Sequence, residues 1–300
     1  MTGRHWIFLT IGSLVAIVGL VASVGYAIDP YGVLRDPRGR KLSIYFSEGK
    51  AKFLMNKRYV PSNFDGLVVG PSSLDNWKLS TLAGATVYNE SLAGGNAAEE
   101  RMLVSQALDR GHFKLAIFVL VSSMTSSHEL KDGLDTVKTS EAIGSIHVLV
   151  HEVAYALKAM HVPFEKSDAA PNGMALFEGH GEIDVHALPP SNFAIDPVAL
   201  EDFRSMVQAV RDRGARIVYV VPPLYEPLYE VNRASYAAYL DTIRRALPPA
   251  PVIDFDGPEY ASLRSDPDNF RDCFHLNPTG AATFTALLEK LVPEAIAYSN

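Results

Sequence analysis

The sequence predicts an α/β protein built on a parallel sheet, preceded by one membrane-spanning helix. Five short runs rich in apolar and β-branched residues are typical of buried strands. Patterns of helical period lie between them, and strand, helix, strand repeats join parallel strands through right-handed crossovers. The chain has 300 residues, of which 48% are hydrophobic and 20% charged. This length is sufficient for one large domain with a buried core.

The first expected element is an uncharged stretch from Trp6 to Ala27, which follows Arg4. Roughly twenty apolar residues are what a helix needs to cross a bilayer. We therefore expect residues 1–28 to be an N-terminal membrane anchor. The alternative is a cleaved signal peptide, whose apolar region is usually only about 7 to 15 residues long.

Residues 29–41 are rich in Pro, Gly and charge, which predicts a linker before a folded body at 42–300. The basic residues of this linker outnumber Arg4 on the other side of the anchor, and the positive-inside bias alone would leave the body in the cytoplasm. Long domains translocate with little regard to charge, so we favour export.

The body holds the five expected strands and the helical patterns between them. The strands are residues 66–70, 85–89, 115–121, 216–221 and 251–255. The helical pattern before the fourth strand ends at Gly214, as a helix stop should. Residues 124–197 separate the third and fourth strands by more than a crossover helix requires. Long insertions in compact domains are usually lids or binding loops, so we expect a lid-like insertion.

Charge and residue spacing argue against several classes of function. The formal net charge is -7, and the chain has no run of Lys and Arg, so a nucleic-acid partner is not expected. The single Cys273 cannot form an internal disulfide. His147 and His151 have a spacing that can hold zinc, but the order is not H-E-x-x-H. We predict neither a metal nor a cofactor.

Small and polar residues follow three of the expected strands. Ser72 and Ser73 come after the first, Gly94 after the second, and Asp272 with His275 after the fifth. Ligands bind at the carboxyl ends of strands in open α/β sheets. A carboxylate three residues from a histidine can orient the imidazole, which then takes a proton from a serine.

A structural alternative needs no chemistry at this place. Asp272 would cap a turn, and His275 would pack against a helix that begins at Asn277 and Pro278, since Asn and Pro are favoured at the N-cap and first helical positions.

Three blocks in this order, G-P-S, N-E-S-L-A-G and D-C-F-H, resemble those of the SGNH (GDSL-like) hydrolase superfamily. The resemblance covers Asp65 to about Leu291 without the insertion. It implies a flavodoxin-like three-layer fold with a five-stranded parallel sheet. It also implies a catalytic triad of Ser72, Asp272 and His275, with Ser73 as the alternative nucleophile. In the family, the Ser72 backbone and Gly94 would bind the oxyanion.

The sequence departs from the family after the third strand. The family usually supplies an oxyanion-hole Asn there, whereas this chain has VSSMTSSH, with Ser122, Ser123 or Thr125 as small donors. Asn96 is a further candidate donor. Losing one such donor costs about 2.7 to 4 kcal/mol in the transition state. Two hypotheses follow: a serine ester hydrolase or O-acyltransferase, and a non-catalytic glycan-binding or polysaccharide-assembly subunit.

The anchor followed by D-P-Y-G and an SGNH-like body resembles bacterial envelope proteins that acylate or deacylate teichoic acids, alginate and other exopolysaccharides. This implies a single pass through the inner membrane, with the body in the periplasm or outside the cell. The partners would be an acylated glycan or acyl donor and polysaccharide-assembly proteins, and the group moved would be an acyl group, acetyl first. Tyr225, beside Tyr229, and His180 are candidate substrate contacts, although ordinary loop packing explains such residues equally.

Overall fold

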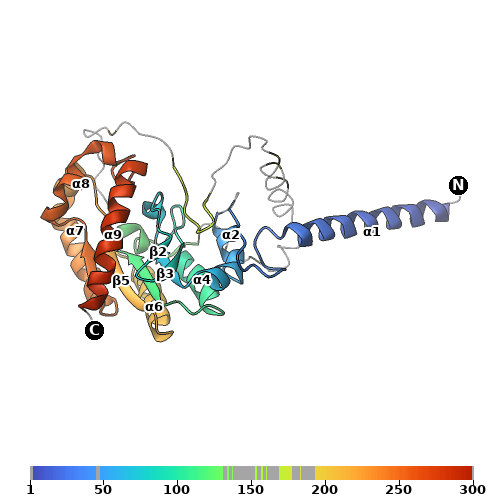
Figure 1. The fold of residues 1–300 in the computed structure, drawn as a ribbon, viewed down its shortest axis with the longest axis horizontal. Helices are drawn as coiled ribbons and strands as arrows, with labels where there is room; N and C mark the ends of the chain where they lie inside the picture. The colour runs from blue at the N-terminus through green and yellow to red at the C-terminus, as the bar shows by residue number, and fades with distance from the viewer. Residues whose placement is uncertain are drawn as a thin grey trace.

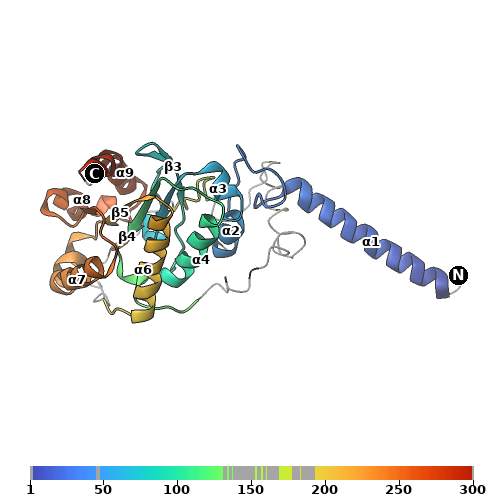
Figure 2. The same ribbon diagram turned by 90° about the horizontal axis from the view of Figure 1, so that it is seen from below.

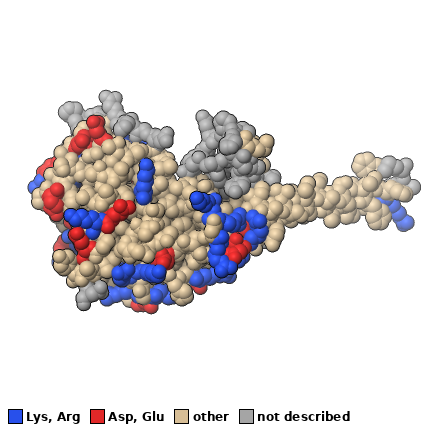
Figure 3. Space-filling model, viewed as in Figure 1, with Lys and Arg blue, Asp and Glu red and all other residues tan. Residues whose placement is uncertain are grey.

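A computed structural model of the chain describes residues 3–44, 48–130, 134, 137, 153, 157, 160, 169–177, 183 and 193–298. Helix α1 (Gly3–Ile28) projects from the body as a single rod (Figure 1). Its apolar window has a mean hydropathy of 2.5, and none of that window is buried. In Figure 3 the rod is almost free of charge except near its N-terminal end, whereas acidic and basic side chains intermingle on the body. The helix is therefore long and apolar enough to cross a membrane, as predicted.

The segment after α1 is irregular, as its composition predicts, but it packs on the body. Tyr31 and Val33 belong to the larger apolar core. The Asp29 carboxylate accepts hydrogen bonds from three successive backbone N–H groups, those of residues 33–35, and pairs with Arg40 at 2.9 Å. Packing against the core thus begins at Tyr31, and the segment is not a free linker.

The body is an α/β domain whose described residues form a six-stranded sheet. The strands are β1 (Gly66–Val69), β2 (Thr81–Leu82), β3 (Ala85–Asn89), β4 (Leu115–Val119), β5 (Arg216–Val221) and β6 (Val252–Asp254), in the order β2-β3-β1-β4-β5-β6. β1 pairs in parallel with β3 and β4, β4 with β5, and β5 with β6. All five predicted strands are therefore present.

The sheet is mixed, which corrects the prediction of five parallel strands. β2 pairs antiparallel with β3 at one edge through a two-residue connection. Ala83 and Gly84 both have positive φ, 47° and 79°, as a tight hairpin turn requires. A two-residue strand joined by an Ala-Gly turn lacks the usual Asn-Gly or Asp-Gly signal, so the sequence pattern did not indicate it.

Both faces of the sheet are covered, so the strands read as continuous apolar runs. Leu67 and Val69 of β1 join the core on one face, and Val68 between them joins the core on the other. The first core is closed by α2 (Glu48–Met55), α3 (Tyr59–Asn63), α4 (Ala97–Leu108), α6 (Pro197–Asp212) and α7 (Glu226–Ala246), and the second by α8 (Ala261–Ser265) and α9 (Pro278–Ala297). Figure 2 shows α4 and α6 on one side of the strands and α9 on the other.

The start of α9 and the end of α6 agree with their sequence signals. Asn277 caps α9 by accepting from the N–H groups of Thr279 and Gly280, with Pro278 at the first helical position. α6 ends at Asp212, and Gly214 follows with φ 86°. Of the predicted insertion at 124–197, residues 169–177 are described as a turn against the end of β3, where the Asn89 N–H donates to the Asn172 carbonyl. The insertion's predicted helix lies mostly outside the described residues.

Candidate active site

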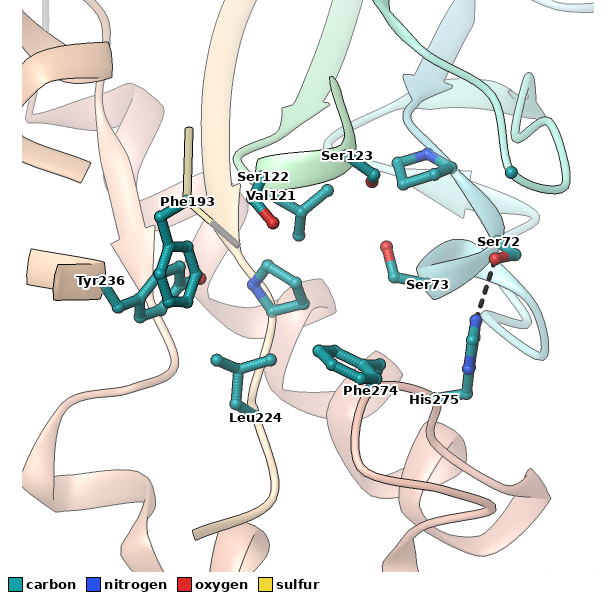
Figure 4. Close-up of a pocket in the computed structure, with 13 residues that line it drawn as sticks. Ser72, Ser73, Val121, Ser122, Ser123, Phe193, Leu224, Tyr236, Phe274 and His275 are labelled. Carbon is teal, nitrogen blue, oxygen red and sulfur yellow. Dashed lines mark hydrogen bonds between the residues drawn. The ribbon is translucent and has the colours of Figure 1, made fainter. Parts of the chain in front are cut away.

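Three of the predicted side chains form a hydrogen-bonded relay. The Ser72 Oγ lies 2.9 Å from the His275 Nε2 (Figure 4). The His275 Nδ1 lies 2.8 Å and 2.9 Å from the two carboxylate oxygens of Asp272. Serine and histidine are 203 positions apart in the chain, and the fold brings them together at the carboxyl edge of the sheet. This is the arrangement of a serine nucleophile, its base and the carboxylate that orients the base.

Ser72 is positioned by the turn that ends β1. The chain leaves β1 at Val69, and Ser72 begins the short 3-10 helix η1 (Ser72–Leu74). A Cβ atom on Gly70 would lie 3.0 Å from the Val119 Cβ, so glycine lets β1 and β4 approach closely here. The first N–H groups of a helix have no acceptor within that helix. The N–H groups of Ser72 and Ser73 can therefore donate hydrogen bonds to an anion beside the Ser72 hydroxyl.

The loop before α9 positions Asp272 and His275. It is closed by a bridge between Phe270 and Leu276, and the Arg271 N–H donates to the His275 carbonyl. Asn277 fixes the loop from the helix side, because its amide donates to the carbonyls of Asp268 and Phe270. The capped helix and the carboxylate–histidine pair, which were alternatives in the sequence, are both present.

Electrostatics favour a charged Asp272. Burial alone would raise the pKa of this carboxyl, but the hydrogen bond from His275 and the backbone N–H groups of Phe274 and His275 lower the pKa below its ordinary value. An ionised carboxylate holds the shared proton on Nδ1 of the imidazole. The Nε2 lone pair then faces the Ser72 hydroxyl and can accept its proton.

A second carboxyl group near the relay was missed by the sequence reasoning. Asp75 is 5% exposed, and its N–H donates to the Ser72 carbonyl at 2.9 Å. Burial and then the charge of Glu48 raise the pKa of Asp75 to about 7, against the opposing charges of Lys52, His275 and Arg271. The only sequence signal was an acidic residue three positions after the serine.

A cavity of about 320 Å³ opens beside Ser72 and His275. Its described lining is Pro71, Ser72, Ser73, Gly94, Val121, Ser122, Ser123, Phe193, Pro222, Leu224, Tyr236, Phe274 and His275. In Figure 4, Ser72 and His275 lie at one side of the cavity and Phe193 and Tyr236 at the other. Gly94 has φ 66°, a backbone conformation that favours glycine. The predicted Gly94 thus lies at the same cavity as the relay.

The serines that line this cavity have different surroundings. Ser72 contacts the histidine, whereas the buried Oγ of Ser73 has no hydrogen-bond partner. Ser122 lines the cavity from η2 (Ser122–Met124), where the expected Asn is missing. Thr125 is not part of the described lining, and its hydroxyl lies 3.2 Å from the hydroxyl of Tyr239. Geometry therefore favours Ser72 over Ser73 as the nucleophile.

Three other predicted contacts are not part of the described cavity. Asn96 caps α4: its carbonyl oxygen accepts from the N–H groups of Ala98 and Glu99, and its amide donates to the Glu129 carbonyl at 2.7 Å. A capping side chain held at both ends has no oxyanion role in this arrangement. Tyr225 is buried in the second core against Phe270, with ring centroids 5.4 Å apart, which explains it as packing. His180 lies outside the described residues.

The described residues contain no group of three His, Cys, Asp or Glu side chains that could hold a metal ion. His147 and His151 lie outside the described residues. The chain matches no protein-family model and, in sequence comparison, no curated protein. The argument for function therefore rests on the geometry of the relay and its cavity.

Proposed function

We propose that this protein is a membrane-anchored serine ester hydrolase or O-acyltransferase of the SGNH type. The observation that carries the proposal is the relay from Asp272 through His275 to Ser72. The strand order supports the family assignment, because the five parallel strands of the described sheet, numbered along the chain, run 2-1-3-4-5, the flavodoxin-like order. Nucleophile, glycine and acid/base pair follow the first, second and last of these strands.

In the proposed mechanism, Ser72 attacks the acyl carbonyl carbon while His275 takes the hydroxyl proton at Nε2. The tetrahedral oxyanion is bound by backbone N–H groups at Ser72 and Gly94. His275 then returns the proton to the leaving alcohol, and an acyl-enzyme on Ser72 is left. Water or a sugar hydroxyl resolves this ester by the reverse sequence, which gives hydrolysis or transfer. Ser122 and Ser123, which line the same cavity, are the candidates for a third oxyanion donor.

The substrate in this proposal is an acyl group of an envelope or extracellular polysaccharide. The exposed apolar α1 supports a single-pass anchor in the bacterial inner membrane, with the body in the periplasm or outside the cell. Acceptor glycans and polysaccharide-assembly proteins are the partners that this location offers. The proposed chemistry needs neither metal nor cofactor.

The test is covalent labelling of the full-length protein in non-ionic detergent with a fluorophosphonate probe, which phosphonylates activated serines. We expect labelling of the wild type and of Ser73→Ala, and none of Ser72→Ala or His275→Ala. Ser73→Ala is the matched control, because it removes a neighbouring hydroxyl from the same cavity. Labelling that survives Ser72→Ala would refute the assigned nucleophile.

One observation favours a second candidate, a non-catalytic glycan-binding or polysaccharide-assembly subunit. The third strand supplies no Asn, and Asn96 is fully used as a helix cap. Loss of a donor weakens oxyanion binding in a site that otherwise keeps its relay. A folded wild type that resists the probe and binds acylated glycan would favour this candidate over the enzyme.

A further inference from the structure

We propose that the cavity beside Ser72 selects an acyl chain longer than acetyl that carries an uncharged oxygen near its far end, received by the Tyr236 hydroxyl. This inference rests on the proposed function, since it assigns the acyl group of that same site. It departs from the acetyl group that the sequence resemblance suggested.

The size of the cavity is the first argument. Its volume of about 320 Å³ falls at the lower end of the range of about 300 to 1,000 Å³ found for sites that bury drug-sized ligands. An acetyl group bound to Ser72 would occupy only the end beside His275. The remaining space, toward Phe193 and Tyr236, would stay unfilled, and unfilled apolar space forfeits packing contacts.

The walls are the second argument. Ser73, Ser122 and Ser123 belong to the described lining, and between the relay and the far end Figure 4 also shows the apolar side chains of Val121, Leu224 and Phe274. These side chains offer an alkyl chain apolar surface, and burying each methylene is worth about 0.8 kcal/mol. No Asp, Glu, Lys or Arg side chain belongs to the described lining. A carboxylate or ammonium at the far end would therefore be buried without a counter-charge, at high cost.

Tyr236 is the third argument and fixes the polar end. This side chain is 2% exposed and packs against Phe193, with ring centroids 5.1 Å apart. Its hydroxyl is buried and has no hydrogen-bond partner in the structure. Figure 4 shows the hydroxyl facing the interior of the cavity. A buried donor left unmatched costs about 1 to 3 kcal/mol, which a ligand oxygen at this place would recover.

The neighbouring tyrosine shows what a satisfied hydroxyl looks like in the same helix. Tyr239 stacks on Tyr236, yet its hydroxyl donates to the Val121 carbonyl at 2.7 Å and contacts Thr125. Tyr239 does not line the described cavity. Tyr236 and Tyr239 thus form a matched pair, in which one hydroxyl serves the fold and the other faces the cavity.

The experiment compares kcat/KM of the full-length protein in detergent for p-nitrophenyl acetate, hexanoate and 5-oxohexanoate. We expect hexanoate to exceed acetate and 5-oxohexanoate to exceed hexanoate by about 3- to 10-fold, the effect of one net hydrogen bond. Tyr236→Phe should abolish the advantage of the oxo group and keep the preference for hexanoate over acetate. Tyr239→Phe should keep both preferences.

Failure of this inference can be separated from failure of the proposed function. Hydrolysis with acetate preferred, or an oxo advantage that survives Tyr236→Phe, would overturn the inference and leave the enzyme standing. If the wild type hydrolyses no ester, calorimetric titration of Ser72→Ala with hexanamide and 5-oxohexanamide decides. Tighter binding of 5-oxohexanamide that depends on Tyr236 would support the inference without catalysis, and binding of neither amide would overturn it.

Discussion

Replacing Asp75 by asparagine should stabilise the protein at pH 8 and leave its stability nearly unchanged at pH 4. The carboxyl is 5% exposed, and burial raises its pKa from 3.8 to about 7. One pKa unit is worth about 1.36 kcal/mol, so the full shift corresponds to at most about 4 kcal/mol of unfolding free energy. Relaxation of the surroundings lowers this ceiling, and we expect about 1 to 3 kcal/mol.

The direction follows from proton binding in the two states. Between pH 4 and 7, Asp75 is protonated in the folded protein and ionised in the unfolded chain. The folded state therefore binds more protons, and its stability falls as pH rises through this window. Above pH 7 the folded protein holds a buried carboxylate, whereas asparagine is neutral at every pH. Asp75→Asn thus removes a penalty that exists only at neutral and higher pH.

The assay is thermal unfolding of the full-length protein in non-ionic detergent at pH 4 and pH 8. Glu90 and Asp256 are also buried carboxyls whose pKa is raised to about 7, so the wild type alone does not isolate Asp75. The difference between wild type and variant at each pH isolates it. Asp268→Asn, at an exposed position, is the control. A variant that is less stable than wild type at pH 8, or equally stabilised at both pH values, would refute the reasoning.

Three further predictions concern the relay, a helix cap and the base of the anchor. Asp272→Asn should lower kcat/KM for ester hydrolysis about 100-fold. This is less than the roughly 10⁴-fold effect of a buried triad carboxylate, because the Asp272 side chain is 48% exposed. An unchanged rate would show that Asp272 has no part in the mechanism. Asn96→Ala should cost about 1 kcal/mol of unfolding free energy with kcat retained, whereas a selective loss of kcat in folded protein would give Asn96 an oxyanion role. Asp29→Ala should leave three N–H groups and Arg40 without their carboxylate and speed tryptic cleavage after α1; an unchanged cleavage rate would contradict a structural role for Asp29.

The five strands and the carboxylate–histidine pair were accessible from sequence because each depends on a local pattern, whereas Ser72, 203 positions from His275, was joined to the pair only through the family resemblance. Strands buried on both faces read as apolar runs, and the D-x-x-H spacing places a carboxylate within reach of the imidazole on one loop. Asn96 misled the prediction because an asparagine after a Gly-Gly pair fits a helix cap and an oxyanion donor equally. Only its contacts with Ala98 and Glu129 distinguish the two roles.

Tyr236 and Asp75 were not predictable, for a different reason. Tyr236 lies within α7, where an aromatic residue reads as ordinary core packing. Its hydroxyl becomes a candidate ligand contact only because α7, the end of β5 and the segment that carries Phe193 meet around one cavity. From the sequence alone, Asp75 is typical of a surface turn residue. Its raised pKa depends on burial and on Glu48, which is distant in sequence and close in the fold. Burial of a single polar atom is a property of the assembled fold, and no pattern along the chain encodes it.

The geometry separates the choice of acyl group from the choice of acceptor. The acyl chain would enter a largely apolar cavity, while the relay stays open to solvent: the side chains of His275 and Asp272 are 29% and 48% exposed. Water and a sugar hydroxyl would therefore reach the acyl-enzyme from the same open side, and His275 would activate either one in the same way. Which product forms then depends on the local concentration of the acceptor. In the proposed function α1 is a membrane anchor, and the segment that follows it packs on the body through Tyr31 and Val33. Such an anchor would keep the body at the membrane surface. Tethering of this kind raises the effective concentration of an acceptor held at the same surface without any new contact in the active site.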